Sequence, residues 1–179
     1  MKITVITGSP HKKGSSALLA EQFSLGASGA GHEVFRFDGA FEKVAPCLGC
    51  GHCGMGDRPC VHRDGMDALN PKLMEADVIA LATPLYYFGM SAQLKTVVDR
   101  FYAINKHLMG SRKRACLLAT AYDPLEALKD LVAQYRSILT YLKWEDAGMV
   151  LAHGCGTRAD IERTDFPQKA LRLGRAVTP

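Results

Sequence analysis

The chain has 179 residues, of which 47% are hydrophobic and 22% are charged, and this composition excludes a disordered chain, a collagen-like fibre or a coiled coil. At this length we expect a single domain, residues 1–179, with no room for a second cofactor domain. The net charge of +4 comes from scattered basic residues, so we expect no nucleic-acid partner. The sequence contains no apolar run of membrane-spanning length and no signal peptide before the first expected strand, which predicts a cytoplasmic protein with no membrane partner.

Expected strands and helices alternate along the chain. Short β-branched or continuous apolar runs predict strands at residues 3–6, 33–37, 77–83, 115–120 and 149–152. Serine caps and apolar residues at helical spacing predict helices at residues 15–30, 64–75, 92–108 and 125–142, followed by a short helical tail. This order predicts an α/β fold with an open parallel sheet, helices on both faces and a ligand site at the carboxyl ends of the strands.

The loop after the first expected strand, residues 8–16, has the composition of an anion site. Its glycines let backbone N–H groups turn inward, its serine hydroxyls add donors, and the helix that follows presents its positive end. The loop lacks the spacing of a nucleoside-triphosphate loop. The alternative interpretation is a polar turn with a good helix cap.

The segment after the third expected strand, residues 83–91, carries three consecutive aromatic residues, Tyr86, Tyr87 and Phe88. In a loop these rings suit a flat, largely apolar ligand. They could instead pack against a helix end or form a subunit contact. Because an anion loop follows a neighbouring strand, we favour a ligand that carries both a ring system and a phosphate.

Four of the six cysteines form the compact pattern Cys47-x2-Cys50-x2-Cys53-x6-Cys60. In a reducing compartment such cysteines are more often metal ligands, catalytic or buried groups than disulfides. Four thiolates match the ligand count of a [4Fe-4S] cluster. Zinc remains an alternative, although its sites more often join two separated cysteine pairs. A loop of small packed residues without any metal is the third interpretation.

The first 105 residues or so resemble the flavodoxin-fold NAD(P)H-dependent FMN reductases, and especially their iron-sulfur flavoprotein branch. The resemblance rests on residues 2–10, the Gly14-Ser15-Ser16 helix start, the cysteine loop, and residues 83–86 with the later Asp99-Arg100-Phe101. It implies a flavodoxin-like open five-stranded parallel sheet in the order 2-1-3-4-5. The family usually has Arg at position 11 and Asn-Thr at positions 15–16, so phosphate charge is balanced less firmly here.

The same resemblance implies FMN as cofactor and assigns residues to it. Ser9, His11, Gly14, Ser15 and Ser16 would lie at the phosphate. The isoalloxazine ring would lie along Pro84, Leu85, Tyr86, Tyr87, Phe88 and Gly89. Ala119 and Thr120, at the end of the next expected strand, begin a segment through Tyr122 that joins the ring site by position only. Independently of the resemblance, Arg158 and Arg163 could meet a nucleotide phosphate, although a surface position is the default. The cysteine motif stands where the iron-sulfur flavoproteins bind a [4Fe-4S] cluster.

The implied activity is an oxidoreductase that takes hydride from NAD(P)H and reduces a quinone, flavin, nitro compound or other acceptor. No side chain is assigned a catalytic role, because the flavin N5 carries the chemistry. One alternative is an iron-sulfur flavoprotein or flavodoxin-type carrier that passes single electrons between protein partners, although a net charge of +4 is unlike the acidic surface of flavodoxins. A redox sensor or zinc module is a further alternative. We expect a homodimer, because flavin sites in this family often lie at a subunit contact.

Overall fold

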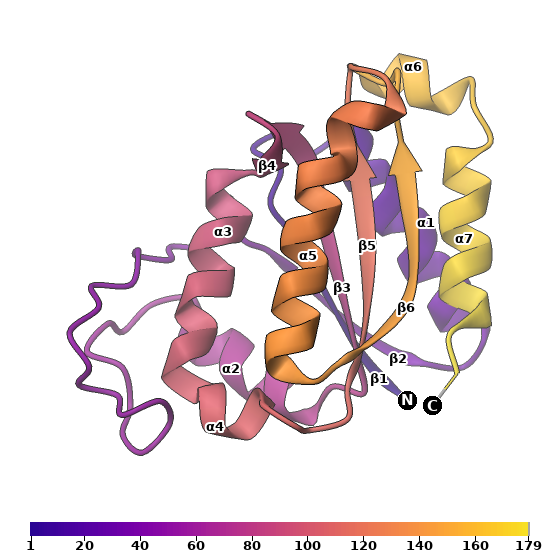
Figure 1. Ribbon diagram of the computed structural model, residues 1–179. Coiled ribbons are helices and arrows are strands. Elements are labelled where there is room, and N and C mark those ends of the chain that lie inside the picture. Colours follow the sequence, from indigo (N-terminus) through magenta and orange to yellow (C-terminus); the bar gives the residue numbers. More distant parts are fainter. Residues whose placement is uncertain (179) are drawn as a thin grey trace.

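The computed structural model describes residues 1–178 and is built around an open twisted sheet (Figure 1). Five parallel strands form it in the order β2-β1-β3-β5-β6, which is the predicted order for the long strands. Their bounds are β1 Lys2–Thr7, β2 Glu33–Asp38, β3 Val78–Tyr86, β5 Arg114–Thr120 and β6 Glu145–Ala152. A sixth strand, β4 (Gly89–Met90), pairs antiparallel with the end of β3 and was not predicted.

Helices cover both faces of the sheet, as predicted (Figure 1). One face carries α1 (Ser15–Gly29), α6 (Arg158–Glu162) and α7 (Phe166–Ala176). The other carries α2 (Met66–Glu75), α3 (Ala92–Asp99), α4 (Asn105–Leu108) and α5 (Lys129–Leu142), with 3-10 turns η1 (Arg100–Ile104) and η2 (Leu125–Leu128). Successive strand residues point to opposite faces, so Val5 packs under α1 while Ile6 packs under α2 and α3.

The expected tail is two helices, and the longer one, α7, lies directly on α1 (Figure 1). Two glycines permit this close approach. A Cβ on Gly26 would lie 2.0 Å from the carbonyl oxygen of Leu171, and one on Gly174 would lie 2.1 Å from that of Phe23. The backbones of the two helices therefore touch, and this contact fixes the position of α1.

Several expected elements have different bounds in the structure, and two of them have a clear physical reason. The helix predicted at 92–108 is divided into α3, η1 and α4, because the chain tightens into a 3-10 turn at Arg100. The last strand begins at Glu145 rather than 149, because its first residues pair with β5 across an irregularity next to Gly148, whose φ is +126°. Within residues 1–178, none of the helices is long and apolar enough to cross a membrane.

Candidate active site and cysteine loop

A cleft of about 720 Å³ opens at the carboxyl ends of the parallel strands. Segments that follow β1, β2, β5 and β6, together with the end of β3, contribute to it, as expected for an open parallel sheet. Of the residues assigned from the sequence, those in its wall are Ser9, His11, Gly14, Ser15, Ser16, Pro84, Leu85, Tyr86 and Thr120.

The loop after β1 is tightly folded at the floor of this cleft. The buried Ser9 hydroxyl accepts the N–H of His11 at 3.1 Å, and the N–H of Gly14 donates to the carbonyl of His11 at 3.0 Å. Helix α1 starts at Ser15, and no side chain in the described part of the chain caps it. The first turn of α1 lines the cleft with its N–H groups uncapped by any described side chain, as in helix N-termini that bind anions.

Gly8, at the start of this loop, packs against the start of α3. The Ser91 hydroxyl donates to the carbonyl of Gly8 at 2.7 Å and accepts the N–H of Leu94 at 3.3 Å, so it caps α3 and holds the loop at once. A Cβ on Gly8 would lie 2.4 Å from the Cβ of Leu94. Only glycine fits at this position without a shift of α3.

Aromatic and small side chains form the other walls. Pro84 and Leu85 belong to the end of β3, and the Ser15 hydroxyl donates to that of Thr120 at 3.2 Å across the cleft. The loops after β5 and β6 are tied together, since the N–H of Cys155 donates to the carbonyl of Ala121 at 2.7 Å. The walls are thus supported by backbone contacts from several strands.

Four assigned residues lie outside the cleft wall: Tyr87, Phe88, Gly89 and Ala119. Tyr87 and Phe88 form the tip of the β3–β4 hairpin, with φ of 45° and 63°, and both rings are exposed. The expectation of an aromatic loop at 86–88 is wrong for Tyr86, because β3 continues through it and the chain turns back one residue later. Ala119 is fully buried in β5 and its side chain joins the core beneath α5.

The cleft wall also contains residues that the sequence did not assign. These are Pro10, Lys12, Lys13, Phe41, Ala121, Tyr122, Cys155, Gly156, Thr157 and Arg158. The sequence had suggested Ala121 and Tyr122 by position only, and Arg158 as a candidate phosphate contact. Three of them, Lys12, Lys13 and Arg158, are cationic, and no aspartate or glutamate is among the described residues of the wall. Lys12 and Lys13 could have been found from their place inside the anion loop. Phe41 carries no local signal, because only the strand order brings it to this cleft.

The charge of Arg158 is partly compensated. Its guanidinium contacts the carboxylates of Glu162 at 2.8 Å and Glu21 at 3.3 Å. The hydrogen bond that Arg158 donates to Glu162, with a smaller effect of Glu21, raises the pKa of Arg158 above its usual value. Lys12 lies over the ring of Phe41, 4.8 Å from its centroid. Lys13 is therefore the cation of the cleft with the least compensation among the described residues.

The cysteine loop connects β2 to α2 and extends away from the sheet beside α3 and α4 (Figure 1). All four cysteines of the motif line one depression, together with His62 and Arg100. Cys47 and Cys50 are exposed, whereas Cys53 is buried. Within residues 1–178, however, no three histidine, cysteine or acidic side chains are close enough to hold a metal ion. The thiols therefore surround a common point without converging on it.

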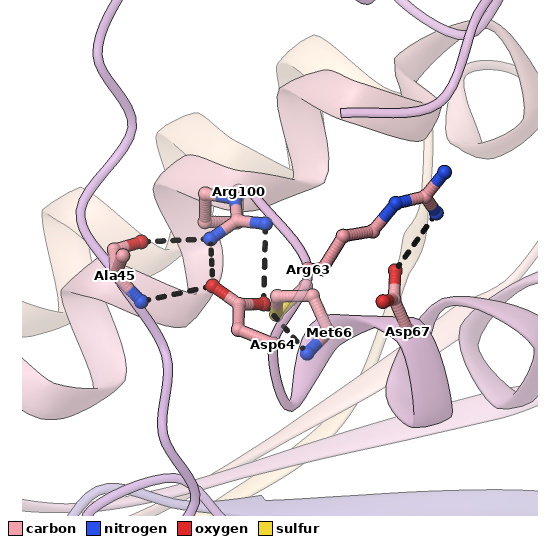
Figure 2. Close-up of polar contacts among 6 residues, drawn as sticks. All are labelled: Ala45, Arg63, Asp64, Met66, Asp67 and Arg100. Atoms are coloured by element: carbon pink, nitrogen blue, oxygen red, sulfur yellow. Dashed lines mark hydrogen bonds and ion pairs between the residues drawn. The ribbon is translucent and has the colours of Figure 1, made fainter. Parts of the chain in front are cut away.

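A buried ion pair closes the base of this loop (Figure 2). Arg100 donates to the Asp64 carboxylate at 2.6 Å and 3.3 Å, and to the carbonyl of Ala45 at 2.8 Å. Asp64 also accepts the N–H of Ala45 and that of Met66, each at 3.0 Å. Burial disfavours the Asp64 carboxylate, but these hydrogen bonds, that of Arg100 first, hold its pKa below the usual value. The two ends of the loop are thus fastened to η1.

Comparison with known proteins agrees with this architecture. The chain is 37% identical over 100 residues to an iron-sulfur flavoprotein of Archaeoglobus fulgidus, a match covering 56% of this chain and 45% of that protein. It is 28% identical over 163 residues, 86% of each chain, to Bacillus subtilis YwqN, provisionally named an NAD(P)H-dependent FMN-containing oxidoreductase. The fold matches an NAD(P)H:quinone oxidoreductase from Methanothermobacter marburgensis with a TM-score of 0.70 and 20% identity, covering 97% of this chain and 94% of that one.

The chain spans about half the length of the iron-sulfur flavoproteins that it matches. The family model described as NADPH-dependent FMN reductase covers much more of this chain and matches residues 1–153. This match includes the first loop, the cysteine loop, the end of β3 and the end of β5. The chain therefore belongs to the NADPH-dependent FMN reductase family.

Proposed function

We propose that this protein is an oxidoreductase that binds FMN in the cleft and uses NAD(P)H to reduce an electron acceptor. The observation that carries the proposal is the charge and shape of the cleft. It has three cationic side chains, no acidic side chain among its described wall residues, and a volume in the range of small-molecule sites. An anionic ligand with a flat ring suits both features.

The residues divide by what they offer such a ligand. The loop from Ser9 to Ser16 would hold the phosphate with backbone N–H groups, hydroxyls and the first turn of α1, and Lys13 would balance its charge. Pro84, Leu85 and Tyr86 would lie along the ring on one side, and residues 120–122 on the other. These segments come from different strands, so the fold itself sets the distance between phosphate and ring.

Bound FMN would supply hydride acceptance and electron transfer, and the chain would supply binding and orientation. Leu85 and Tyr86 would cover part of the ring and limit its contact with water. Tyr87, Phe88 and Gly89 follow at the hairpin tip, where we propose that they meet the incoming substrate. A quinone, a free flavin or a nitro compound, each a flat acceptor, suits these exposed rings.

A second candidate function is one-electron transfer through a [4Fe-4S] cluster held by Cys47, Cys50, Cys53 and Cys60. The arrangement of four thiols around one depression favours it, as do relatives that are named iron-sulfur flavoproteins. The donor set fits a cluster in number and chemistry. The enclosed space of about 20 Å³ holds roughly one water molecule, so the loop must open to admit a cluster.

Part of this loop does not pack against the rest of the protein. Gly49 and Gly51 have positive φ, and a Cβ on either would meet nothing within 4 Å, so this part of the loop stands in open space. Outward movement of Cys47 and Cys50 would leave the fastening at Asp64 and Arg100 intact. Four iron and four sulfide ions per chain after anaerobic preparation would support the cluster, whereas stoichiometric zinc would support a structural metal site instead.

We also propose that the protein forms a homodimer. An apolar groove of about 600 Å³ runs between η1 and α5, and its wall includes Phe101, Tyr102, Ile138 and Tyr141. Exposed apolar surface of this kind favours association. Sedimentation at micromolar concentration tests this, since a monomer mass would contradict it.

The flavin proposal is tested by the double variant Ser9→Ala/Ser15→Ala. Removing two hydroxyl groups at the phosphate should weaken FMN binding by about 1–3 kcal/mol. The matched control is Ser24→Ala, which removes a hydroxyl that donates to the carbonyl of Ala20 within α1, away from the cleft. The protein as purified should release FMN rather than FAD on denaturation. Equal FMN affinity in the double variant and the control would contradict the phosphate assignment.

A further inference from the structure

Arg100 is an unusual residue for the inside of a small domain. Its side chain is only 2% exposed, and that of its partner Asp64 is 9% exposed. The two terminal nitrogens are occupied by Asp64 and by the carbonyl of Ala45 (Figure 2). These three hydrogen bonds leave two of the five N–H groups, that of Nε and one on Nη2, and Nε is buried with no hydrogen-bond partner among residues 1–178. A buried donor of a cationic group is costly to leave without an acceptor.

The surroundings of Arg100 suggest what this acceptor is. Arg100 lines the same depression as the four cysteines of the motif. A second buried atom without a partner among the described residues, Nε2 of His62, lines it too. Burial alone would lower the pKa of Arg100, but the hydrogen bond and charge of Asp64, with a smaller effect of the Cys60 sulfur, raise it. Arg100 and Cys60 line the same depression.

Asp64 does not use up the capacity of Arg100, because the carboxylate is shared among several donors. It accepts the N–H groups of Ala45 and Met66 as well as both terminal nitrogens of Arg100. These contacts hold the plane of the guanidinium in a fixed position. One edge of the cation is therefore committed to the base of the loop, and Nε remains for a group on the cysteine side.

We propose that Arg100, held in place by Asp64, is a positioning residue that donates Nε–H to a sulfur of an iron-sulfur cluster bound by the four cysteines. The inference rests on the cluster suggested under the second candidate function. Net charge and hydrogen bonds to sulfur set the potential of such clusters. Arg100 would therefore stabilise the reduced form more than the oxidised form and raise the reduction potential.

The electron balance of this step is simple. Reduction by dithionite adds one electron to a [4Fe-4S] cluster with four thiolate ligands, and its total charge changes from −2 to −3 while no proton is taken up. The added charge lies on iron and sulfur, next to the fixed positive charge of Arg100. Removing that cation should disfavour the added electron, and removing its counter-ion should favour it.

Two variants separate this electrostatic role from simple closure of the loop. Asp64→Asn keeps the cation and removes its counter-ion, so the potential should rise. Asp64→Asn/Arg100→Met removes both charges without leaving a buried anion unpaired, so the potential should fall. We expect the ratio of reduced to oxidised cluster at a fixed potential to change about tenfold, which corresponds to a shift of about 59 mV in the one-electron reduction potential.

Arg63 provides the matched control. It lies next to Asp64 in sequence, but its side chain is 70% exposed. Its guanidinium makes a long contact, 3.8 Å, with the Asp67 carboxylate (Figure 2). Solvent screens its charge, so Arg63→Gln should leave the potential unchanged. The measurement is a redox titration of the full-length protein monitored by electron paramagnetic resonance, with iron and sulfide content determined on the same samples.

Opposite shifts in the two variants, with no shift in Arg63→Gln, are the expected result. Loss of the cluster from the double variant would overturn the proposal, because it would show that the pair is needed to close the loop. Shifts in the same direction, no shift, or loss of the cluster from Asp64→Asn would overturn it, because the pair would then only close the loop. Wild-type protein that holds no iron after anaerobic reconstitution would overturn both this inference and the proposed cluster, and the iron content separates that result from the others.

Discussion

Replacing Gly8 by alanine tests how closely the first loop is fitted to α3. The added Cβ would lie 2.4 Å from the Cβ of Leu94 and 2.5 Å from the hydroxyl oxygen of Ser91, where real contacts exceed 3 Å. Relieving this overlap requires the start of α3 to move. Overpacking of this kind costs about 1–3 kcal/mol. Loss of the buried hydrogen bond from Ser91 adds about 1 kcal/mol.

We therefore expect Gly8→Ala to lower the free energy of unfolding by about 2–4 kcal/mol. With a urea m-value of about 2 kcal/mol per molar, the unfolding midpoint should fall by about 1–2 M. Fluorescence-monitored urea unfolding of the FMN-free protein measures this directly. FMN titration should also show weaker binding, because the loop that carries Ser9 shifts with Gly8.

The matched control is Gly29→Ala at the end of α1, where an added Cβ would meet nothing within 4 Å. This change should raise stability by about 0.5 kcal/mol, because alanine loses less backbone entropy on folding than glycine. An unfolding midpoint for Gly8→Ala within experimental error of wild type would refute the reasoning. It would mean that α3 can shift to accommodate the added Cβ without loss of stability.

Lys13→Gln should weaken FMN binding about two- to fivefold, and by less at high salt. Lys169→Gln, on the exposed part of α7, should leave FMN binding unchanged. Isothermal titration at two ionic strengths measures both effects. Replacing Tyr87-Phe88 by Asn-Gly should raise the free energy of unfolding by about 1–2 kcal/mol, because Asn-Gly suits the positive φ of both positions. It should also lower turnover at unchanged FMN content. Normal turnover would show that the two rings take no part in the reaction. Burial lowers the pKa of Lys113 below 10.5, so the unfolded chain binds more protons just below that pH. Wild type should therefore gain stability relative to Lys113→Met as the pH rises toward 10.5, and unfolding curves at several pH values would contradict this if the difference were constant.

Local patterns predicted part of the site correctly in kind. The glycines and serines at residues 8–16 follow a buried strand directly, so sequence alone indicates both the turn and the exposed start of α1. Pro84 to Tyr86 were expected at the carboxyl end of the third strand and lie there, although β3 continues through them and they are not a loop. In both cases the relevant contacts are made within a few residues of the chain.

Contacts between distant segments could not be predicted in this way. Phe41 and Thr157 reach the cleft only because the sheet brings the ends of different strands together. Arg100 matches the spacing of an ordinary helix, and its burial depends on Asp64, which is 36 residues away. The hairpin at Tyr87 was not predicted, because β3 continues to Tyr86, beyond the end of its apolar run. Sequence periodicity reports burial along one element and not which elements meet.

The central claim is that the cleft holds FMN that accepts hydride from a nicotinamide donor. Anaerobic stopped-flow mixing of the flavin-loaded protein with NADPH or NADH tests it most directly. The account predicts rapid bleaching of the flavin absorbance by at least one donor, with one nicotinamide oxidised per FMN, because each hydride carries two electrons. Flavin that dithionite bleaches but neither NADPH nor NADH reduces would contradict the account.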